Sequence, residues 1–327
     1  MISFLFKRVW HALAVLVGVN TLTFVLFFSV NTPDDMARLN IGGKRITADQ
    51  IDKWKTERGY DKPLYWNARE PGVRAVTETI FWERSASLML LQFGRGDGES
   101  AGDIGSQIQV RMGASMQLAV PLFILQLYVS IAMALLLVYF RHTRIDAWGV
   151  TLCVVMLSIS SLLYLLFGQF LFSRVFKLAP ISGFAGGWDA FKFLALPVFL
   201  SLLARLGTEA RLYRAMFLEE LGKDYVRTAR AKGLSERRVL SGHVLRNALI
   251  PIMTSAGAYI PYVFMGSLLT ESFFGIPGLG AYVIDAIASQ DFAIVRTMVF
   301  LGALLTVASY VLVDLAYSWA DPRVRLA

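Results

Sequence analysis

The sequence predicts an all-α, polytopic membrane protein with about six transmembrane helices and an external segment between the first and second helices. Of the 327 residues, 56% are hydrophobic and only 17% are charged, and the mean hydropathy is +0.54. Soluble domains carry roughly 45–50% apolar and about 25% charged residues. The apolar residues also gather into runs of about twenty, the helix length that crosses a bilayer. Both observations favour repeated membrane crossings.

Charge and cysteine content narrow the class further. A formal charge of +8 favours Lys and Arg in cytoplasmic loops over nucleic-acid binding, because membrane proteins concentrate positive residues on that side. The single cysteine, Cys153, lies in the apolar run TLCVVML and excludes a disulfide within the chain. We expect it to be a small packed residue without a redox role.

The first span is expected within residues 1–30. Lys7 and Arg8 precede its apolar run, as in a secretory signal. The run is about twenty residues long, however, against roughly 7–15 in a signal peptide, and no small-residue cleavage site follows it. We therefore expect a first transmembrane helix with a cytoplasmic N-terminus.

Residues 31–115 form the predicted external, periplasmic segment. Its charges nearly balance and it contains several Trp and Tyr residues, which predicts a small packed subdomain. The stretch ITADQIDKWKTERG predicts a helix with Thr47 as N-cap and Gly59 as its stop. The glycine-rich turn Gly94–Gly98 lacks the Gly-Lys-Ser/Thr ending of a phosphate loop, so we expect a plain loop there.

Residues 116–327 are expected to form a membrane core of five further spans. A proline at position 197 would kink the fourth span, which is short. A basic turn after the second span fits the cytoplasmic side, and six crossings return the C-terminus to that side. The expected spans are residues 118–140, 148–172, 191–206, 249–269 and 293–317.

Few charged residues fall near these spans. Asp314 and Glu271 lie near the ends of apolar runs, so we interpret them as reaching the interface rather than as proton or ion sites. No chain of Asp, Glu or His lies within the expected spans, which argues against a proton relay. The sequence also lacks a Walker A motif. We therefore expect no enzyme activity and no nucleotide hydrolysis by this chain.

A long polar segment, residues 207–248, separates the fourth and fifth spans. From Arg205 to Asn247 there are ten Lys and Arg against five Asp and Glu. On the cytoplasmic side, such a segment is either a rigid polar docking element that transmits force to the membrane helices, or a basic surface that binds anionic lipid. Physical reasoning alone leaves both interpretations open.

Two helices are expected in this segment. DYVRTARAKG predicts an amphipathic helix with Tyr225, Val226 and Ala229 on one side and Gly233 as C-cap. Arg227, Arg230 and Lys232 are expected to be displayed elsewhere on that helix. Ser235 is a plausible N-cap for a second helix that continues to residue 251.

This segment resembles the cytoplasmic coupling loop of binding-protein-dependent ABC-transporter permeases, most of all the branch that imports dipeptides, oligopeptides and nickel. The general loop signature is Glu-Ala-Ala, three residues, then Gly. Here Arg-Thr-Ala at residues 227–229 precedes Gly233, the form typical of the peptide branch. The likeness continues in HVLRNALIP, ESFFGIPGLG and the terminal DPRVR, and it is weakest in residues 31–82.

The resemblance implies one of two permease subunits of an ATP-driven importer in a bacterial inner membrane, with both termini cytoplasmic. Its partners would be a second permease subunit, one or two cytoplasmic ATPase subunits, an extracytoplasmic solute-binding protein and the lipid bilayer, and no nucleic acid. No cofactor or metal would bind this chain, and ATP and Mg would be used by the ATPases. The coupling helix, about Gly222 to Gly233, would dock in a groove of the ATPase. The residues assigned to the coupling loop, none of them catalytic, are Gly222, Asp224, Tyr225, Arg227, Thr228, Ala229, Arg230, Lys232, Gly233, His243, Arg246, Asn247 and Pro251.

Di- and oligopeptides are the favoured solutes. Nickel favours His-rich sites, and the three histidines, His11, His142 and His243, all lie at or near expected cytoplasmic ends. Import of nickel or another small solute is the first alternative. An ion-driven secondary transporter, which would be expected to show midplane charges or inverted repeats, and a lipid-binding scaffold are the others.

Overall fold

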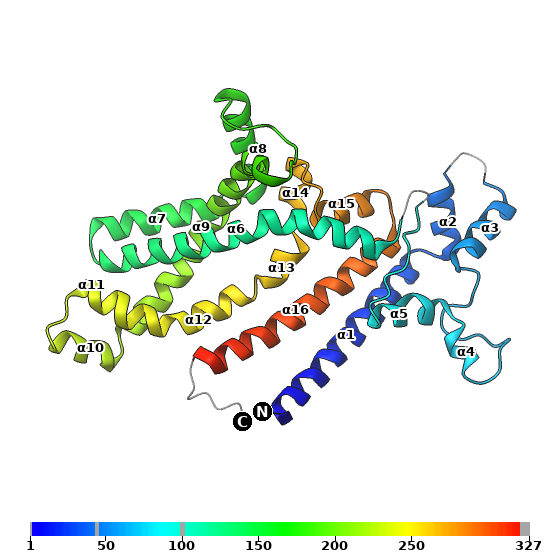
Figure 1. Ribbon diagram of the computed structural model, residues 1–327, viewed down its shortest axis with the longest axis horizontal. Coiled ribbons are helices and arrows are strands. Elements are labelled where there is room, and N and C mark those ends of the chain that lie inside the picture. Colours follow the sequence, from blue (N-terminus) through cyan, green and yellow to red (C-terminus); the bar gives the residue numbers. More distant parts are fainter. Residues whose placement is uncertain (1, 43–45, 99–101, 321–327) are drawn as a thin grey trace. The chain divides into compact units, whose positions relative to one another are not determined.

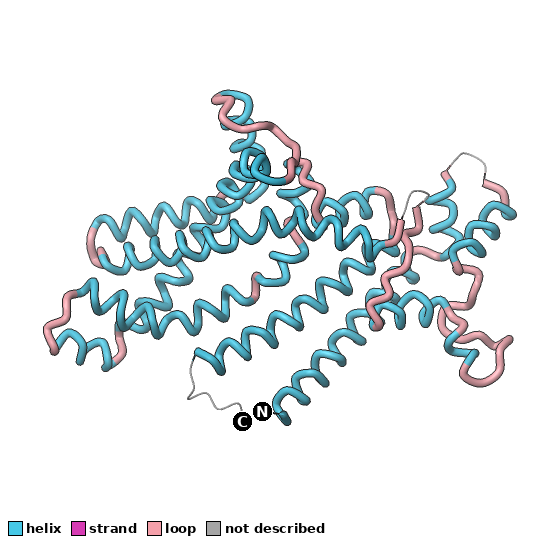
Figure 2. The backbone as a smooth tube through the Cα atoms, in the orientation of Figure 1, coloured by secondary structure: helices cyan, strands magenta, loops and turns pink. Residues whose placement is uncertain are grey.

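A computed structural model describes residues 2–42, 46–98 and 102–320 of the chain (Figure 1). Within these residues the fold is all-α, as predicted, and the only extended pairing is an isolated bridge between Arg95 and Asp103 (Figure 2). The chain forms two compact units. The first comprises the described parts of Met1–Arg111 and Tyr282–Ala308, and the second those of Met112–Ala281 and Ser309–Arg325.

The first unit contains the long apolar helix α1 and a set of short helices. A capping box between Thr32 and Asp35 starts α2, and Gly59 ends α3 with φ +71°, which confirms the predicted stop. The helices that lie wholly in this unit are α1 (Ile2–Val30), α2 (Pro33–Ile41), α3 (Ala48–Arg58), α4 (Arg74–Thr77), the π-helical turn η1 (Trp82–Ala86) and α5 (Ser87–Met89).

Aromatic side chains hold this unit together. Trp54 stacks on Tyr60 with ring centroids 5.4 Å apart, and Phe24 of α1 meets Phe81 edge-on at 5.1 Å. Each such pair contributes about 0.5–1.5 kcal/mol beyond the burial of its surface. The segment after the first span therefore packs, as its aromatic content predicts.

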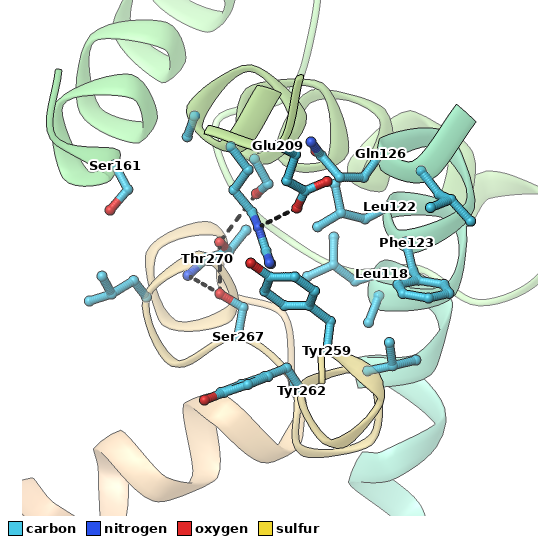
Figure 3. Close-up of a pocket in the computed structure, with 18 of the residues that line it drawn as sticks. Leu118, Leu122, Phe123, Gln126, Ser161, Glu209, Tyr259, Tyr262, Ser267 and Thr270 are labelled. Carbon is cyan, nitrogen blue, oxygen red and sulfur yellow. Dashed lines mark hydrogen bonds and ion pairs between the residues drawn. The ribbon is translucent and has the colours of Figure 1, made fainter. Parts of the chain in front are cut away.

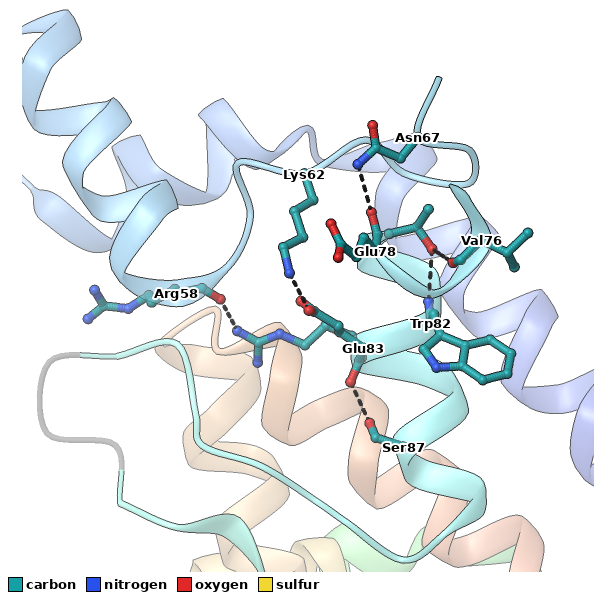
Figure 4. A network of polar contacts seen from close by, with 10 residues as sticks. Arg58, Lys62, Asn67, Val76, Glu78, Trp82, Glu83 and Ser87 are labelled. Carbon is teal, nitrogen blue, oxygen red and sulfur yellow. Dashed lines mark hydrogen bonds and ion pairs between the residues drawn. The ribbon is translucent and has the colours of Figure 1, made fainter. Parts of the chain in front are cut away.

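Polar contacts fix the turn η1 in the same unit (Figure 4). Lys62 forms an ion pair with Glu83, whose backbone carbonyl accepts a hydrogen bond from Ser87 at 2.6 Å. The Arg84 guanidinium donates to the Arg58 carbonyl at 2.5 Å. These contacts tie η1 to the end of α3 and to the loop that follows it.

The glycine-rich turn at residues 94–98 is a loop, as expected, but it contains a buried acid. Asp97 is buried, and its carboxylate accepts hydrogen bonds from the Tyr60 hydroxyl at 2.8 Å and the Ala293 amide at 3.1 Å. The Asp291 carboxylate accepts in turn from the amides of Asp97 and Gly98. Buried hydrogen bonds therefore connect this turn to the start of α16, about 195 residues later in the sequence.

The second unit is built around α9, a helix of 32 residues. Helices α6 (Ile104–Tyr139), α15 (Leu279–Ala288) and α16 (Phe292–Ala320) each have residues in both units. The elements wholly in the second unit are α7 (Arg144–Ser158), α8 (Ser161–Gln169), η2 (Phe170–Val175), η3 (Gly187–Asp189), α9 (Ala190–Leu221), α10 (Asp224–Ala231), α11 (Glu236–Arg238), η4 (Val239–Val244), α12 (Leu245–Gly257), α13 (Ile260–Met265) and α14 (Leu268–Phe274).

Four described helices, α1, α6, α9 and α16, are long and apolar enough to cross a membrane. Two bent pairs raise the number to six if each is one span: Arg144–Ser158 with Ser161–Val175, and Glu236–Gly257 with Ile260–Phe274. The chain is thus a multi-pass membrane protein, and the expectation of about six spans agrees with this upper number. The side chain of Asp314 and the terminal segment 321–325 lie outside the described residues.

Three helices differ in extent or continuity from the expected spans. Helix α6 begins at Ile104 rather than near residue 118, and α9 runs unbroken through Pro197 to Leu221 instead of ending near residue 206. The third span breaks at Ile159–Ser160 with a bend of 88°. At this break the Met156 carbonyl accepts from the Ile159 amide at 3.4 Å and from the Tyr164 hydroxyl at 3.1 Å, so backbone and side chain both satisfy the end of α7.

Close packing of α7 against α9 explains the lone cysteine. Cys153 is fully buried, and a Cβ placed on Gly207 would lie 2.5 Å from the Cys153 carbonyl oxygen. Glycine at this position therefore lets the two helices approach, and Cys153 fills the contact as a small packed residue.

Candidate functional site

The segment between α9 and α12 folds as an ordered hairpin, here called the coupling hairpin (residues 222–244), at the end of those two helices (Figure 1). Helix α9 ends at Gly222, and α10 begins at Asp224. The predicted loop of residues 207–248 is thus shorter, because residues 207–221 continue α9 and residues 245–248 already belong to α12.

Gly233 makes the turn after α10, as predicted. Its φ is +79°, its amide donates to the Arg230 carbonyl at 2.9 Å, and the Leu234 amide donates to the Ala229 carbonyl at 3.4 Å. This pair of bonds is a Schellman motif, which satisfies carbonyls that the helix end would leave unpaired. The turn thus has a defined backbone geometry.

The apolar face of α10 is buried in the second unit. Val226 is fully buried and Ala229 is 5% exposed, and both belong to a core cluster with Phe217 of α9, Val239 of η4 and Ile252 of α12. Burial of a valine side chain contributes about 1.5–3 kcal/mol. The hairpin is therefore packed against both helices that it connects.

The opposite face of α10 is polar and open. Asp224, Arg227, Thr228 and Lys232 are exposed, and Arg227 lies 3.5 Å from the Asp224 carboxylate. Arg230 was expected among the displayed cations.

Arg230 is instead tied back into the hairpin. Its guanidinium donates to both oxygens of Glu236, at 2.8 and 3.4 Å, and this fork bridges the Gly233 turn. Arg141 contacts the same carboxylate at 3.7 Å. Arg230 therefore braces the two arms of the hairpin rather than being presented.

Glu220, at the end of α9, anchors the start of α10. Its carboxylate accepts from Lys223 Nζ at 2.5 Å and from the Tyr225 hydroxyl. Burial and this hydrogen bond raise the pKa of Tyr225 to about 12. Tyr225 thus joins two consecutive helices across Gly222.

The remaining candidate residues lie in the second arm of the hairpin and in α12. His243 and Arg246 are exposed, and the exposed Asn247 donates to the His243 carbonyl at 3.1 Å. Ser235 has the extended backbone of an N-cap, but its side chain makes no capping bond. Pro251 lies half-buried inside α12. The structure therefore exposes Gly222, Asp224, Arg227, Thr228, Lys232 and Gly233 around α10, holds Tyr225, Ala229 and Arg230 within the hairpin, and places Pro251 in α12.

An ion pair between α7 and α9 was missed at the sequence level. Arg214 donates to both carboxylate oxygens of Asp146, at 3.0 and 2.7 Å. Such bidentate pairs are among the stronger side-chain hydrogen bonds. The only available signal was an Asp in the first turn of a helix, and its partner lies 68 residues away.

A cavity of about 460 Å³ lies in the second unit among α6, α8, α9 and the segments around α13 (Figure 3). Its wall is mainly apolar, with Leu118, Leu122 and Phe123 from α6, Tyr259 from the break before α13 and Tyr262 from α13 itself. The volume falls in the range of small-molecule sites, roughly 300–1,000 Å³.

One side of this cavity is charged. Arg205 Nε lies 3.5 Å from Glu209 Oε1, and the Arg205 guanidinium lies 4.0 Å from the centre of the Tyr259 ring. Ser130 donates to the other Glu209 oxygen at 3.4 Å and accepts from Gln126 Nε2 at 3.0 Å. Arg205 lies within the predicted fourth span, whereas Glu209 lies in the part of α9 beyond the predicted end at residue 206.

The motif ESFFGIPGLG has a structural role. Glu271 is fully buried and does not reach an interface, contrary to expectation. Its carboxylate accepts from the amides of Gly280 at 2.7 Å, Ala281 at 3.2 Å and Ser267 at 3.2 Å. It thereby caps the N-terminus of α15, where backbone amides are otherwise unpaired.

The glycines of this motif make room for that carboxylate. A Cβ on Gly278 would lie 2.5 Å from the Ser115 hydroxyl, and one on Gly266, five residues before the motif, would lie 2.7 Å from the same atom. A Cβ on Gly280 would lie 2.6 Å from the Ser267 carbonyl carbon. The small residues and the acid are therefore one packing unit.

Within the described residues, no three His, Cys, Asp or Glu side chains are grouped so that they could hold a metal ion. The polar groups brought together by the fold are instead those of the coupling hairpin and of the cavity.

Comparison with known proteins assigns the family. Residues 126–326 match the family described as binding-protein-dependent transport system inner membrane component, and residues 1–78 match its N-terminal companion family. The chain is 32% identical to a putative peptide transport system permease protein of Brucella abortus, over 99% of both chains. It is 28% identical to the dipeptide transport system permease protein of Bacillus subtilis, over 100% of this chain and 99% of the relative. With the corresponding protein of Escherichia coli K12 it shares 27% identity over 99% of both. The chain is therefore a multi-pass permease subunit that belongs to the binding-protein-dependent transport system inner membrane component family.

Proposed function

We propose that this chain is one permease subunit of an ATP-driven importer of di- or oligopeptides in a bacterial inner membrane. It works with a second permease subunit, one or two ATPase subunits and an extracytoplasmic binding protein. Both termini and the coupling hairpin lie on the cytoplasmic side, and the segment after α1 lies outside. The names of the peptide and dipeptide permeases that align over nearly the whole chain support the solute class.

The observation that carries the coupling role is the two-faced build of α10. Its apolar face is buried against α9 and α12, whereas Asp224, Arg227 and Lys232 are exposed. A docked ATPase would therefore push on a surface that is packed directly onto membrane helices, which move as units. Lipid binding alone would require neither the Schellman turn nor the Arg230–Glu236 fork.

Cross-linking in the purified assembly tests this role. Thr228→Cys places a thiol on the exposed face of α10, and Ser289→Cys places one on an exposed residue just beyond α15. We expect a bifunctional maleimide to join Thr228→Cys, but not Ser289→Cys, to an ATP-hydrolysing subunit. Capture from Ser289→Cys alone would reject the assignment of the hairpin.

Transport tests the solute class. The assembly, reconstituted in liposomes with its binding protein, should take up a labelled dipeptide or tripeptide only when ATP is supplied. Uptake driven by an ion gradient without ATP would instead establish a secondary transporter.

A further inference from the structure

The guanidinium of Arg205 is open to a ligand. In the described structure it uses Nε for the ion pair with Glu209 and lies over the Tyr259 ring, and no hydrogen bond engages its two Nη groups. Its side chain remains 39% exposed, whereas that of Glu209 is 6% exposed. A planar guanidinium with free Nη groups suits a carboxylate, which it can bind in a bidentate manner.

The charges of the cavity limit what can enter it. Arg205 and Glu209 offset each other, so a ligand with a net charge would bring an uncompensated charge into a mainly apolar site, which is costly. A ligand with one positive and one negative end adds no net charge and can exchange partners with the pair.

We propose that this cavity binds a short zwitterionic peptide in transit, with its terminal carboxylate on the Nη groups of Arg205. The proposal rests on the proposed function for the solute class and adds a binding site within the permease itself. Leu118, Leu122 and Tyr262 form apolar wall that accepts varied side chains. A lipid chain would cover this wall but offer no acceptor to the Nη groups of Arg205.

Photo-cross-linking to the purified whole assembly tests the site. The probe is a tripeptide with photoleucine between two alanines, used at high concentration without the binding protein, and the matched probe is its C-terminal amide. We expect the acid to label the cavity-lining parts of α6, α9 and the α12–α13 break. The amide should label them at least tenfold less, because it lacks the anionic group for Arg205.

Variants on one helix sharpen the result. Arg205→Gln should reduce labelling by the acid at least tenfold, and Arg205→Lys should restore part of it. Arg211→Gln removes an exposed arginine of the same helix that does not line the cavity, and should leave labelling unchanged. Equal labelling by acid and amide, labelling confined to other segments, or protection by added lipid instead of by unlabelled tripeptide would overturn the proposal.

Uptake separates this proposal from the function on which it rests. If wild-type liposomes take up trialanine with ATP but the cavity is not labelled, the site is wrong and the importer assignment stands. If no peptide is taken up while the cavity still binds the acid probe, the solute assignment fails instead.

Discussion

Replacement of Gly233 by alanine should loosen the coupling hairpin by an amount set by the backbone alone. Gly233 has φ +79°, and a Cβ built there meets no heavy atom within 4 Å. The cost is therefore that of a left-handed conformation for an L-residue, about 1–2 kcal/mol, without a clash term. That free energy corresponds to a factor of roughly 5–30 in the opening equilibrium of the hairpin.

Amide hydrogen exchange of the 222–238 peptide in the purified assembly measures this opening. We expect exchange of Gly233→Ala to rise by that factor, Gly233→Asn to rise less because Asn tolerates the left-handed region, and Gly233→Val to rise most. Gly242→Ala is the control, since Gly242 is exposed, helical and has open space around its Cβ position. Unchanged exchange in Gly233→Ala, or a greater effect in Gly233→Asn, would refute the backbone argument.

Three further outcomes follow from named contacts. The pKa of Tyr225 is raised to about 12 in the folded protein from an unfolded value near 10. The neutral phenol therefore stabilises the folded hairpin below pH 10. This stabilisation is lost as pH rises from about 10 to about 12. An ultraviolet difference titration of wild type against Tyr225→Phe should show ionisation of this phenol with a midpoint near pH 12. A midpoint near pH 10 would contradict the prediction. Glu271→Gln replaces one acceptor of the α15 cap by a donor and should cost about 1–3 kcal/mol, seen as a lower Tm in detergent, whereas the exposed Glu219→Gln should change Tm little. Gly207→Ala should lower the stability by about 1–3 kcal/mol, because the added methyl group overpacks against Cys153. Gly113→Ala should not lower it, because there is open space around Gly113. Equal Tm values for these two variants would disprove the close approach of α7 and α9.

The sequence predicted the elements whose signals are local. Apolar runs predicted the membrane class, and the pattern around Val226, Ala229 and Gly233 predicted the short amphipathic helix and its turn. The end of α9 was misplaced because hydropathy falls after residue 206. The helical spacing of the apolar residues Ala210, Tyr213 and Phe217, all buried, was the signal that the helix continues.

The buried acids could not be assigned from the sequence. Glu271, Asp97 and Asp146 each take partners that the fold supplies, and for Asp97 and Asp146 these partners lie far away in the chain. A carboxylate near the end of an apolar run has the same local pattern whether it reaches the interface or caps a helix. The cavity was missed for the same reason, because its wall is formed by six helices that are separate in the sequence.

Helix α9 connects the two candidate sites without an intervening loop. It carries Arg205 and Glu209 at the cavity and Glu220 at the hairpin, and at 1.5 Å per residue the 17 residues from Arg205 to Gly222 span about 25 Å. The Arg214–Asp146 pair and the close contact at Gly207 attach α7 to the same helix. A hairpin displaced by a docked ATPase would therefore carry α9 and α7 together. The change of shape would be taken up where the backbone already bends, at the 88° break after α7 and the 42° break after α12, and the second of these carries Tyr259 of the cavity wall.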